Sequence, residues 1–346
     1  MRIAFYAPMK PPTHPTPSGD RTLARALLGA LNARLVSDLR VYDGLGDDGV
    51  QSDLFAKAAG ECDRLCTELA GEIDIWVSYH NYYKAPDLLG PHVAARLGLP
   101  YVLIEASRAR KRLNGPWARF ANAAEAATDA AALVFYLTAQ DHAALERDRP
   151  DHQCLLHLAP FLACDDLPAA SQGTQILAAG MMRGADKLAS YRLIAKTLRK
   201  YDQPFRLEIA GDGPAHAEVR AMMAPFGDQV RFVGALDGAQ MAQAYARAGV
   251  LFWPGVNEAF GMVYLEAAAH GLAVLAQDRP GVRDVAPGGV DVATGPDGMA
   301  AALARLLNDA PFRATQALAG RARVAQTHLL GAARATLHTG LARVLA

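Results

Sequence analysis

The sequence has few cysteines, no excess of charge of either sign and no long hydrophobic run. Its four cysteines form no Cys-x-x-Cys pair and have no histidine cluster beside them, so their spacing predicts no zinc site and favours free thiols in a reducing compartment. Lys plus Arg and Asp plus Glu number 35 each, which argues against a nucleic-acid-binding protein. No stretch approaches the roughly 20 apolar residues of a membrane-spanning helix, and the N-terminus lacks the apolar segment of a signal peptide. We therefore expect a cytoplasmic protein.

Two blocks of alternating strand and helix patterns make up the 346 residues, a length that suits two domains. Apolar runs separated by amphipathic helical patterns are typical of parallel sheets covered by helices on both faces. A polar segment with Pro and Gly at 163–173 predicts a linker between the blocks. The predicted strands are 2–7, 73–79, 100–104 and 131–136 in the first block and 175–179, 205–210, 230–233, 250–253 and 273–276 in the second, with helices at 22–35 and 186–201 among others.

Residues 254–271, PGVNEAFGMVYLEAAAHG, carry the most specific pattern. Glu258 and Glu266 flank a Gly-centred turn that opens onto a helix. A helix N-terminus offers unpaired N–H groups and the positive end of the dipole, which suit a phosphate, and a carboxylate two turns further on suits a vicinal diol such as a ribose. If the helix starts near Phe260, the two glutamates lie about 12 Å apart along its axis. That is the span of a molecule with a ribose at one end and a sugar at the other.

With these glutamates, the second block resembles the retaining, nucleotide-sugar-dependent glycosyltransferases of family 4 (glycosyl transferases group 1). The segments that agree with this family are LEIAGDGP at 207–214, RFVG at 231–234, AGVLFWP at 248–254 and the paired glutamates. The resemblance covers most of 175–290, and the first block is similar more loosely, through its first strand and the Pro-Ser-Gly loop. It implies an α/β protein of the GT-B fold, with two Rossmann-like doubly wound domains facing across a cleft. The implied boundaries are 1–165 for an acceptor-side domain, 166–328 for a donor-binding domain, and 329–346 for a helix packing back on the first.

The resemblance also implies roles for donor-side residues. Glu266 is expected to bind the donor ribose, and Glu258 to face the donor sugar and diphosphate; the backbone N–H groups expected beside Glu258 are those of Ala259, Phe260, Gly261, Met262 and Val263. Arg183 and Lys187 are expected to stabilise the departing diphosphate, although Met181 stands where the family commonly has its Arg. Gly19 would let the backbone approach the phosphates from the other domain. Open alternatives are a dipole-favoured acid at Glu258, solvated charges at Arg183 and Lys187, and a plain loop glycine at Gly19.

On the acceptor side, His80 and Asn81 end one predicted strand and Glu105 ends the next. We expect a catalytic role for His80 and acceptor contacts for Asn81 and Glu105; a structural histidine is the alternative. The basic run SRARKR at 107–112 is followed by Trp117 and has three open interpretations: contact with anionic lipid headgroups, contact with an acidic acceptor, or a solvated charged loop. The basic side chains of that run are Arg108, Arg110, Lys111 and Arg112.

We therefore predict a glycosyltransferase that moves a sugar from a nucleoside diphosphate to a hydroxyl of a small-molecule, lipid or glycan acceptor, with retention of configuration. No cofactor or metal is expected, because no Asp-x-Asp signature stands in a suitable loop. The alternatives are an inactive GT-B subunit that binds a sugar or scaffolds a partner, and a nucleotide-sugar epimerase or phosphorylase of the same fold. A nicotinamide dehydrogenase is disfavoured because no Gly-x-Gly-x-x-Gly follows the first strand.

Overall fold

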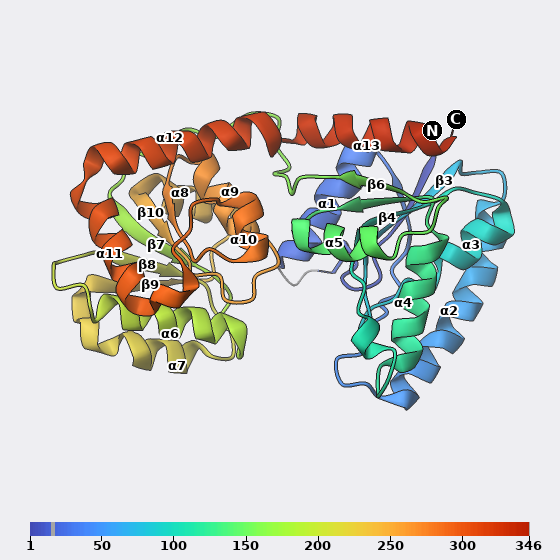
Figure 1. Ribbon diagram of the computed structural model, residues 1–346, viewed down its shortest axis with the longest axis horizontal. Helices are drawn as coiled ribbons and strands as arrows, with labels where there is room; N and C mark the ends of the chain where they lie inside the picture. The colour runs from blue at the N-terminus through green and yellow to red at the C-terminus, as the bar shows by residue number, and fades with distance from the viewer. Residues whose placement is uncertain (15–17, 346) are drawn as a thin grey trace. The chain divides into compact units, whose positions relative to one another are not determined.

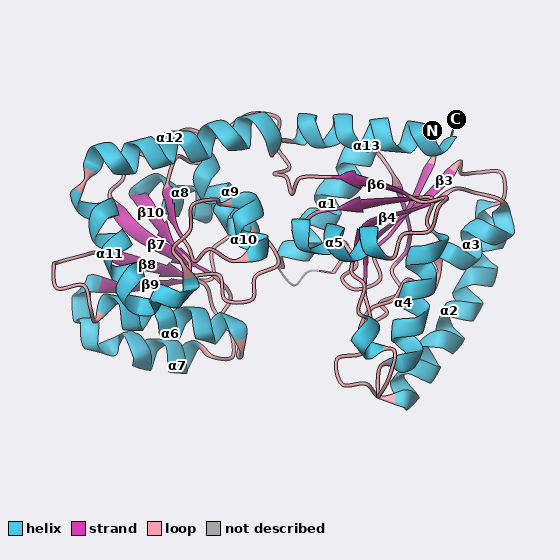
Figure 2. Cartoon of the chain, viewed as in Figure 1, coloured by secondary structure: helices cyan, strands magenta, loops and turns pink. Residues whose placement is uncertain are grey.

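The chain folds into two compact units, each built on one parallel sheet with helices on both faces (Figures 1 and 2). The computed structural model describes residues 1–14 and 18–345. The first unit comprises Met1–Ala159 and the segment from Leu330 onward, and the second comprises Pro160–Leu329. The predicted fold class, α/β with two doubly wound parallel sheets, is confirmed.

The first unit has a six-stranded sheet in the order β2-β1-β3-β4-β5-β6, with every neighbouring pair parallel. Because the chain runs outward from β1 on one side and from β3 on the other, the switch in strand order falls between β1 and β3. The strands are β1 Ile3–Tyr6, β2 Arg34–Ser37, β3 Ile75–Asn81, β4 Tyr101–Ala106, β5 Leu133–Tyr136 and β6 Cys154–His157. The helices are α1 Gly19–Leu31, α2 Asp48–Leu69, α3 Gly90–Leu97, η1 Arg110–Arg112, α4 Ala118–Ala130, α5 Ala139–Arg147 and α13 Leu330–Leu345.

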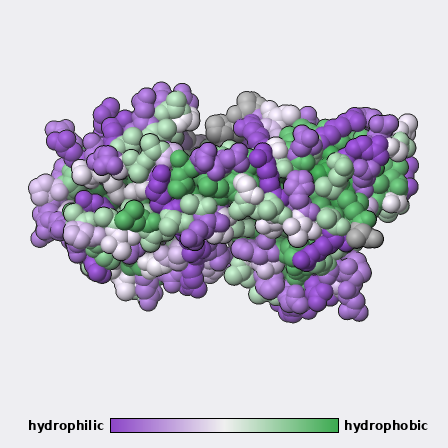
Figure 3. All heavy atoms as spheres, turned by 90° about the horizontal axis from the view of Figure 1, so that it is seen from above, coloured by the Kyte–Doolittle hydropathy of each residue, from purple (hydrophilic) through white to green (hydrophobic). Residues whose placement is uncertain are grey.

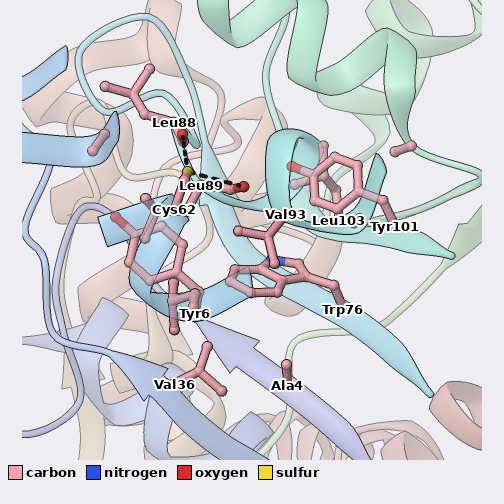
Figure 4. Close-up of a cluster of buried hydrophobic side chains, with 14 of the residues drawn as sticks. Ala4, Tyr6, Val36, Cys62, Trp76, Leu88, Leu89, Val93, Tyr101 and Leu103 are labelled. Atoms are coloured by element: carbon pink, nitrogen blue, oxygen red, sulfur yellow. Dashed lines mark hydrogen bonds between the residues drawn. The ribbon is translucent and has the colours of Figure 1, made fainter. Parts of the chain in front are cut away.

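Alternate side chains of these strands face two separate cores, as the period of two requires. On one face Tyr6 and Trp76 meet edge to face at 6.3 Å and pack with residues of α2 and α3 (Figure 4). Cys62 belongs to this cluster, and burial raises the pKa of its thiol to about 12, so it is inert. On the other face Phe135 lies against α13, where a Cβ at Gly340 would be 2.4 Å from the Phe135 ring.

The second unit has a five-stranded parallel sheet in the order β11-β10-β7-β8-β9, whose switch in strand order falls between β7 and β10. The strands are β7 Gln175–Ala179, β8 Leu207–Ala210, β9 Val230–Gly234, β10 Ala248–Phe252 and β11 Ala273–Leu275. The helices are α6 Asp186–Leu198, α7 His216–Met223, η2 Ala224–Gln229, α8 Gly238–Arg247, α9 Met262–Ala269, α10 Pro280–Val285, η3 Val292–Thr294, α11 Gly295–Asn308 and α12 Ala310–Thr327.

Two predicted boundaries differ from the structure. The helix expected over 22–35 ends at Leu31, where Asn32 takes a left-handed conformation, because the next residues pair with β1 as strand β2. The boundary between the units lies at Ala159 rather than at 165, since Leu162 donates its N–H to the His328 carbonyl at 2.8 Å within the second unit.

No helix among the described residues is long and apolar enough to cross a membrane. On the face drawn in Figure 3, hydrophobic residues lie among hydrophilic ones in both units. Large exposed hydrophobic side chains are few, and Leu45 is the most exposed of those found, at 86%.

Candidate active site

The loops that follow β7 and β10 lie at the switch in strand order of the second sheet. In open parallel sheets ligands bind in this place, at the carboxyl ends of the strands on either side of the switch. The loop after β7 carries Arg183 and leads to Lys187 in the first turn of α6, and the loop after β10 carries Glu258 and leads to α9. The topology therefore brings the loops of both predicted donor-side motifs to one edge of one sheet.

The loop between β10 and α9 is held in a tight, defined shape. Gly261, the residue just before α9, has φ 79°, and a Cβ there would lie 2.7 Å from the Tyr264 ring, so only glycine fits without strain. Asn257 has φ 51° and donates its side-chain N–H to Asp186 Oδ1 at 2.8 Å. Val256 donates its backbone N–H to Ser190 Oγ at 3.1 Å. Because both partners are on α6, the loop is fixed to the helix that carries Lys187.

Glu258 lies before α9, not on it. The helix begins at Met262, about two residues after the predicted start near Phe260, so the axial spacing derived from a helix that spans both glutamates does not apply. Glu258 Oε1 accepts a hydrogen bond from Trp253 Nε1 at 2.9 Å and a charge-assisted one from Lys187 Nζ. The Lys187 ammonium also lies 5.4 Å from the centroid of the Trp253 ring. The structure thus pairs two predicted residues, Lys187 and Glu258, directly, and Trp253, which the sequence pattern did not single out, contacts both.

The sequence feature that could have identified Trp253 as a site residue is its position directly after the buried strand β10, next to Pro254. Its side chain is fully buried, and its ring fills the space over Gly180, where a Cβ would lie 2.6 Å away. A large indole wedged between the loop after β7 and Glu258 fixes the carboxylate in a defined position.

Arg183 stands on an exposed part of the loop between β7 and α6. Its backbone N–H bonds the Met181 carbonyl at 3.0 Å, and no side-chain partner is found for it within residues 1–14 and 18–345. The loop itself is anchored, because Met182 donates its N–H to Asp212 O at 2.9 Å and a Cβ at Gly213 would lie 2.5 Å from Met182 O. Arg183 thus has an exposed side chain on an anchored backbone, and its donor role stays a prediction.

Glu266 lies on the partly exposed side of α9, whose other residues are mostly buried. Its Oε2 accepts a hydrogen bond from the Tyr245 hydroxyl at 2.8 Å. Tyr245 is itself stacked on His270, with ring centroids 4.7 Å apart. Tyr245 and His270 were not singled out from the sequence. They could have been recognised as an aromatic residue on the buried face of α8 and a histidine four residues after Glu266. The pair holds Glu266 in place and leaves its second oxygen for another donor.

An open hollow of about 370 Å³ also occurs in the second unit, lined in part by Tyr201, Phe205 and Leu307. It lies at the amino end of β7, the edge opposite to the one that binds ligands in parallel sheets, so we assign it no role in the site. No group of three metal-ligating side chains is found in the described part of the chain.

In the first unit, His80 and Glu105 come together at the carboxyl ends of β3 and β4. His80 Nδ1 and Glu105 Oε2 are 3.4 Å apart, and both side chains are largely buried. Both residues have positive φ, 69° and 60°, a strained conformation for non-glycine residues that is concentrated at functional sites. The hydroxyl of Tyr79 is buried beside them without a hydrogen-bond partner among the described residues.

The free energy of unfolding should depend on pH through the protonation of His80. Burial acts to lower the pKa of His80, but the charges of Glu105 and Asp20 raise it by more, and the pKa lies above its ordinary value; the other charge near it is Lys10, which lowers it. Asp141 on α5 also interacts with it. A raised pKa stabilises the folded state fully below the unfolded value of about 6.5 and loses this effect as pH rises through the folded pKa.

His80→Asn, which tolerates a positive φ, should therefore reduce the free energy of unfolding most at acid pH, and the deficit should shrink as pH rises. Urea unfolding of both proteins between about pH 5.5 and about pH 8.5 measures this difference. In a Glu105→Gln background the deficit should no longer shrink as pH rises, because burial, which lowers the pKa of His80, is then opposed only by Asp20. A deficit that grows with pH in the protein that keeps Glu105 would contradict the assignment.

Asn81 and Gly19 are two further predicted residues of the first unit. Asn81 is buried, and its amide donates to Ala124 O and Thr128 Oγ1, both at 2.9 Å, while its Oδ1 accepts from Asp87 N–H at 2.9 Å. The expected acceptor contact of Asn81 is not supported, because these internal bonds use the side chain. Gly19 is the first residue of α1, and no described atom lies within 4 Å of a Cβ built there, so its approach to phosphates stays a prediction.

The basic run 107–112 is not one charged surface. Arg108 is buried to 1% exposure and ion-paired with Glu125 and Asp129, and Arg110 is paired with Asp148. Contact with lipid headgroups, one of the three open interpretations, is therefore wrong for Arg108, whose charge is neutralised inside the unit, and is weakened for Arg110. Lys111 is exposed, and Arg112 lies half-buried against aromatic rings.

The fold and part of the sequence are similar to those of known proteins. A solved Anabaena protein, HepE in complex with UDP and glucose, matches with a TM-score of 0.75 and 14% identity, over 99% of this chain and 100% of that one. The chain has the GT-B fold. Residues 173–309, which include both loops at the switch in strand order, match the sequence model of the family Glycosyl transferases group 1, and this segment belongs to that family.

Two curated relatives match shorter stretches. Sulfoquinovosyl transferase SQD2 of Arabidopsis thaliana is 35% identical over 82 residues, which are 24% of this chain and 16% of that protein. A GDP-mannose-dependent alpha-mannosyltransferase of Mycobacterium tuberculosis is 40% identical over 80 residues, 23% of this chain and 20% of that protein. The matched stretches thus span a fifth or less of each relative.

Proposed function

We propose that this protein is a retaining glycosyltransferase that moves a sugar from a nucleoside diphosphate to an acceptor hydroxyl. The observation that carries the proposal is the Glu258–Lys187–Trp253 group at the switch in strand order, directly before the N-terminus of α9, with Glu266 on the same helix. Supporting it, the segment that matches the Glycosyl transferases group 1 family contains all four residues. One similar structure is a complex with UDP and glucose, and one relative is a GDP-mannose-dependent mannosyltransferase, which supports the class of donor and leaves the base open.

The proposed reaction exchanges one C–O bond for another at the anomeric carbon. The bond from this carbon to the β-phosphate oxygen breaks, and a bond from the acceptor oxygen forms on the same face of the sugar. The acceptor proton passes to the departing phosphate oxygen, so no separate base is required. The site's contribution is positioning together with stabilisation of the developing diphosphate charge.

Charge stabilisation comes from three sources in this proposal. Lys187, held by Glu258, and Arg183, on its anchored loop, supply fixed positive charge. The first N–H groups of α9 add the positive end of a helix dipole, with no side-chain cap at Gly261 to occupy them. With these cations in place we propose a metal-independent reaction. We place it in the cytoplasm, because the four cysteines are free thiols.

A nucleoside diphosphate should raise the melting temperature of the protein, and Glu266→Ala should abolish the rise. A ligand at a hundredfold excess over its dissociation constant stabilises the folded state by about 2.7 kcal/mol. UDP, GDP, TDP and ADP are tested separately; in the proposed site Glu266 binds the ribose diol of UDP, GDP and ADP, whereas TDP, a deoxyribonucleotide, lacks the 2′-hydroxyl. Glu218→Ala, which removes an exposed carboxylate paired with Arg192, is the matched control and should keep the shift.

If none of the four nucleotides shifts the melting temperature of the wild-type protein, the donor site does not exist as proposed. The rival proposals are separated by product analysis with the nucleotide sugar that binds best. A glycosyltransferase releases the nucleoside diphosphate in step with transfer, an epimerase returns a changed nucleotide sugar, and an inactive scaffold subunit binds without turnover.

A further inference from the structure

A group of aromatic rings and cations lies on the loops at the carboxyl edge of the first sheet. The loop after β3 carries Tyr83 and Lys84, and the loop after β4 carries Arg112 and leads to Trp117. We call these four residues the cation–aromatic clamp. Loops after neighbouring parallel strands meet at the edge where such sheets bind ligands. The clamp therefore stands where the first unit is expected to hold a substrate.

The two rings form a corner against which both cations rest. The Tyr83 and Trp117 centroids are 5.8 Å apart with their planes at 87°. Lys84 Nζ lies 5.7 Å from the first centroid and 5.3 Å from the second. Arg112 Cζ lies 5.1 Å from the first and 5.2 Å from the second. Two positive charges thus lie against the same two aromatic rings.

The corner is rigid. Trp117 Nε1 donates to Asp43 O at 3.1 Å, and Asp43 N–H donates to Lys84 O at 2.9 Å, so the backbone of Asp43 ties the two loops together. The Asp43 carboxylate is turned to its own loop, where it accepts from Leu45, Gly46 and Asp47 N–H groups and from Gln51. Burial raises its pKa, but these bonds lower it by more, and the group stays ionised without neutralising the clamp.

Neither cation of the clamp has an ion pair among the described residues. This contrasts with Arg108 and Arg110 of the same loop, each of which is paired with a carboxylate. Lys84 and Arg112 are half-buried, and Arg112 Nε is buried without a hydrogen-bond partner in the described chain. Two like charges against one pair of rings repel each other, and an anion that bonds both removes this cost.

We propose that the cation–aromatic clamp binds an anionic group, a phosphate or carboxylate, carried by the acceptor. The clamp is linked to the His80–Glu105 pair through Tyr82, whose ring lies 5.0 Å from His80 and 5.5 Å from Tyr83. An acceptor held by its anion at the clamp extends its polyol portion toward these buried polar groups. That the ligand is the acceptor rests on the proposed function; that an anion binds does not.

The test measures the binding of sn-glycerol 3-phosphate to the full chain by titration calorimetry, with glycerol as the uncharged control and saturating UDP to occupy a donor site. The wild-type protein should bind the phosphate and not glycerol. Arg112→Gln and Lys84→Gln should each weaken binding at least about tenfold, the loss of one charge-assisted bond. Lys111→Gln, an equal charge change at an exposed neighbour, should bind as the wild type does, and Arg112→Lys should recover most of the affinity.

A second arm measures co-sedimentation with vesicles of phosphatidylcholine containing phosphatidylglycerol. Vesicle binding that depends on Arg112 would support the proposal and identify a lipid headgroup as the anion. Binding of sn-glycerol 3-phosphate without vesicle binding would support the proposal and identify a soluble phosphorylated acceptor. The proposal is overturned if the wild type binds neither probe, or if Lys111→Gln loses as much affinity as Arg112→Gln. Melting curves of each variant verify folding. Failure of UDP to bind would count against the donor site alone, because the clamp is tested by the binding of sn-glycerol 3-phosphate.

Discussion

Glu258→Gln should lower turnover by about 10²–10³-fold, the typical cost of losing one preorganised electrostatic group. The Glu258 carboxylate takes hydrogen bonds from Lys187 and Trp253 at one oxygen, and glutamine keeps the shape but not the charge. Lys187 then loses its partner, and the face presented to the donor sugar becomes neutral. We expect nucleoside diphosphate binding to change much less, because Glu266 and the start of α9 are untouched.

The measurement is the initial rate of nucleoside diphosphate release with the nucleotide sugar that the melting experiment selects. Glu218→Gln, at an exposed ion pair of α7, provides the control and should turn over as the wild type does. Full activity of Glu258→Gln would remove Glu258 from the catalytic residues and leave Lys187 and Arg183 as the candidates.

Gly281→Ala should weaken nucleotide binding strongly although it adds only one methyl group. A Cβ at Gly281 would lie 1.4 Å from Ala259 O and 2.4 Å from Ala259 C. These are backbone atoms of the loop between β10 and α9, so they cannot rotate away as a side chain would. The loop must shift, and the N–H groups and Glu258 move with it; we expect affinity for the nucleotide to fall more than about tenfold, since such sites depend on placement within about 1 Å.

Gly60→Ala is the matched control for this substitution. Gly60 is inside α2, and no atom lies within 4 Å of a Cβ built there. The alanine should raise the free energy of unfolding by roughly 0.5–1 kcal/mol and leave nucleotide binding unchanged. Calorimetric titration with the nucleotide and urea unfolding measure the two effects. Wild-type affinity in Gly281→Ala would show that the loop does not form the donor site.

The sequence predicted most of the strands because buried parallel strands are short apolar runs, a local property. β7, β8, β9, β10 and β11 all appeared within a few residues of their observed bounds. β2 was missed and absorbed into a helix, because Arg34–Ser37 becomes a strand only by pairing with β1 some thirty residues earlier. The start of α9 was misplaced because Gly261 has a left-handed conformation that ends the loop, and a local pattern does not show where that conformation falls.

For the site, the sequence supplied the residue types and the structure decided which of them are available. Asn81 and Arg108 carry the same polar groups as many ligand-binding residues, yet their bonds are satisfied by Thr128 and by Glu125, partners far along the chain. The same folding left Lys84 and Arg112 against two rings with no carboxylate among the described residues. No spacing rule within 107–112 distinguishes Arg108 from Arg112.

The sequence by itself determined the α/β class, the two-unit organisation and the paired glutamates with Lys187, since each depends on local periodicity or on a short motif. Only the tertiary structure decided that Lys187 and Trp253 meet at Glu258, that Tyr245 holds Glu266, and that His80 meets Glu105. The physical reason is that strand order brings loops from different parts of the chain to one sheet edge, and hydrogen bonds and ion pairs made there decide which polar groups remain for a ligand.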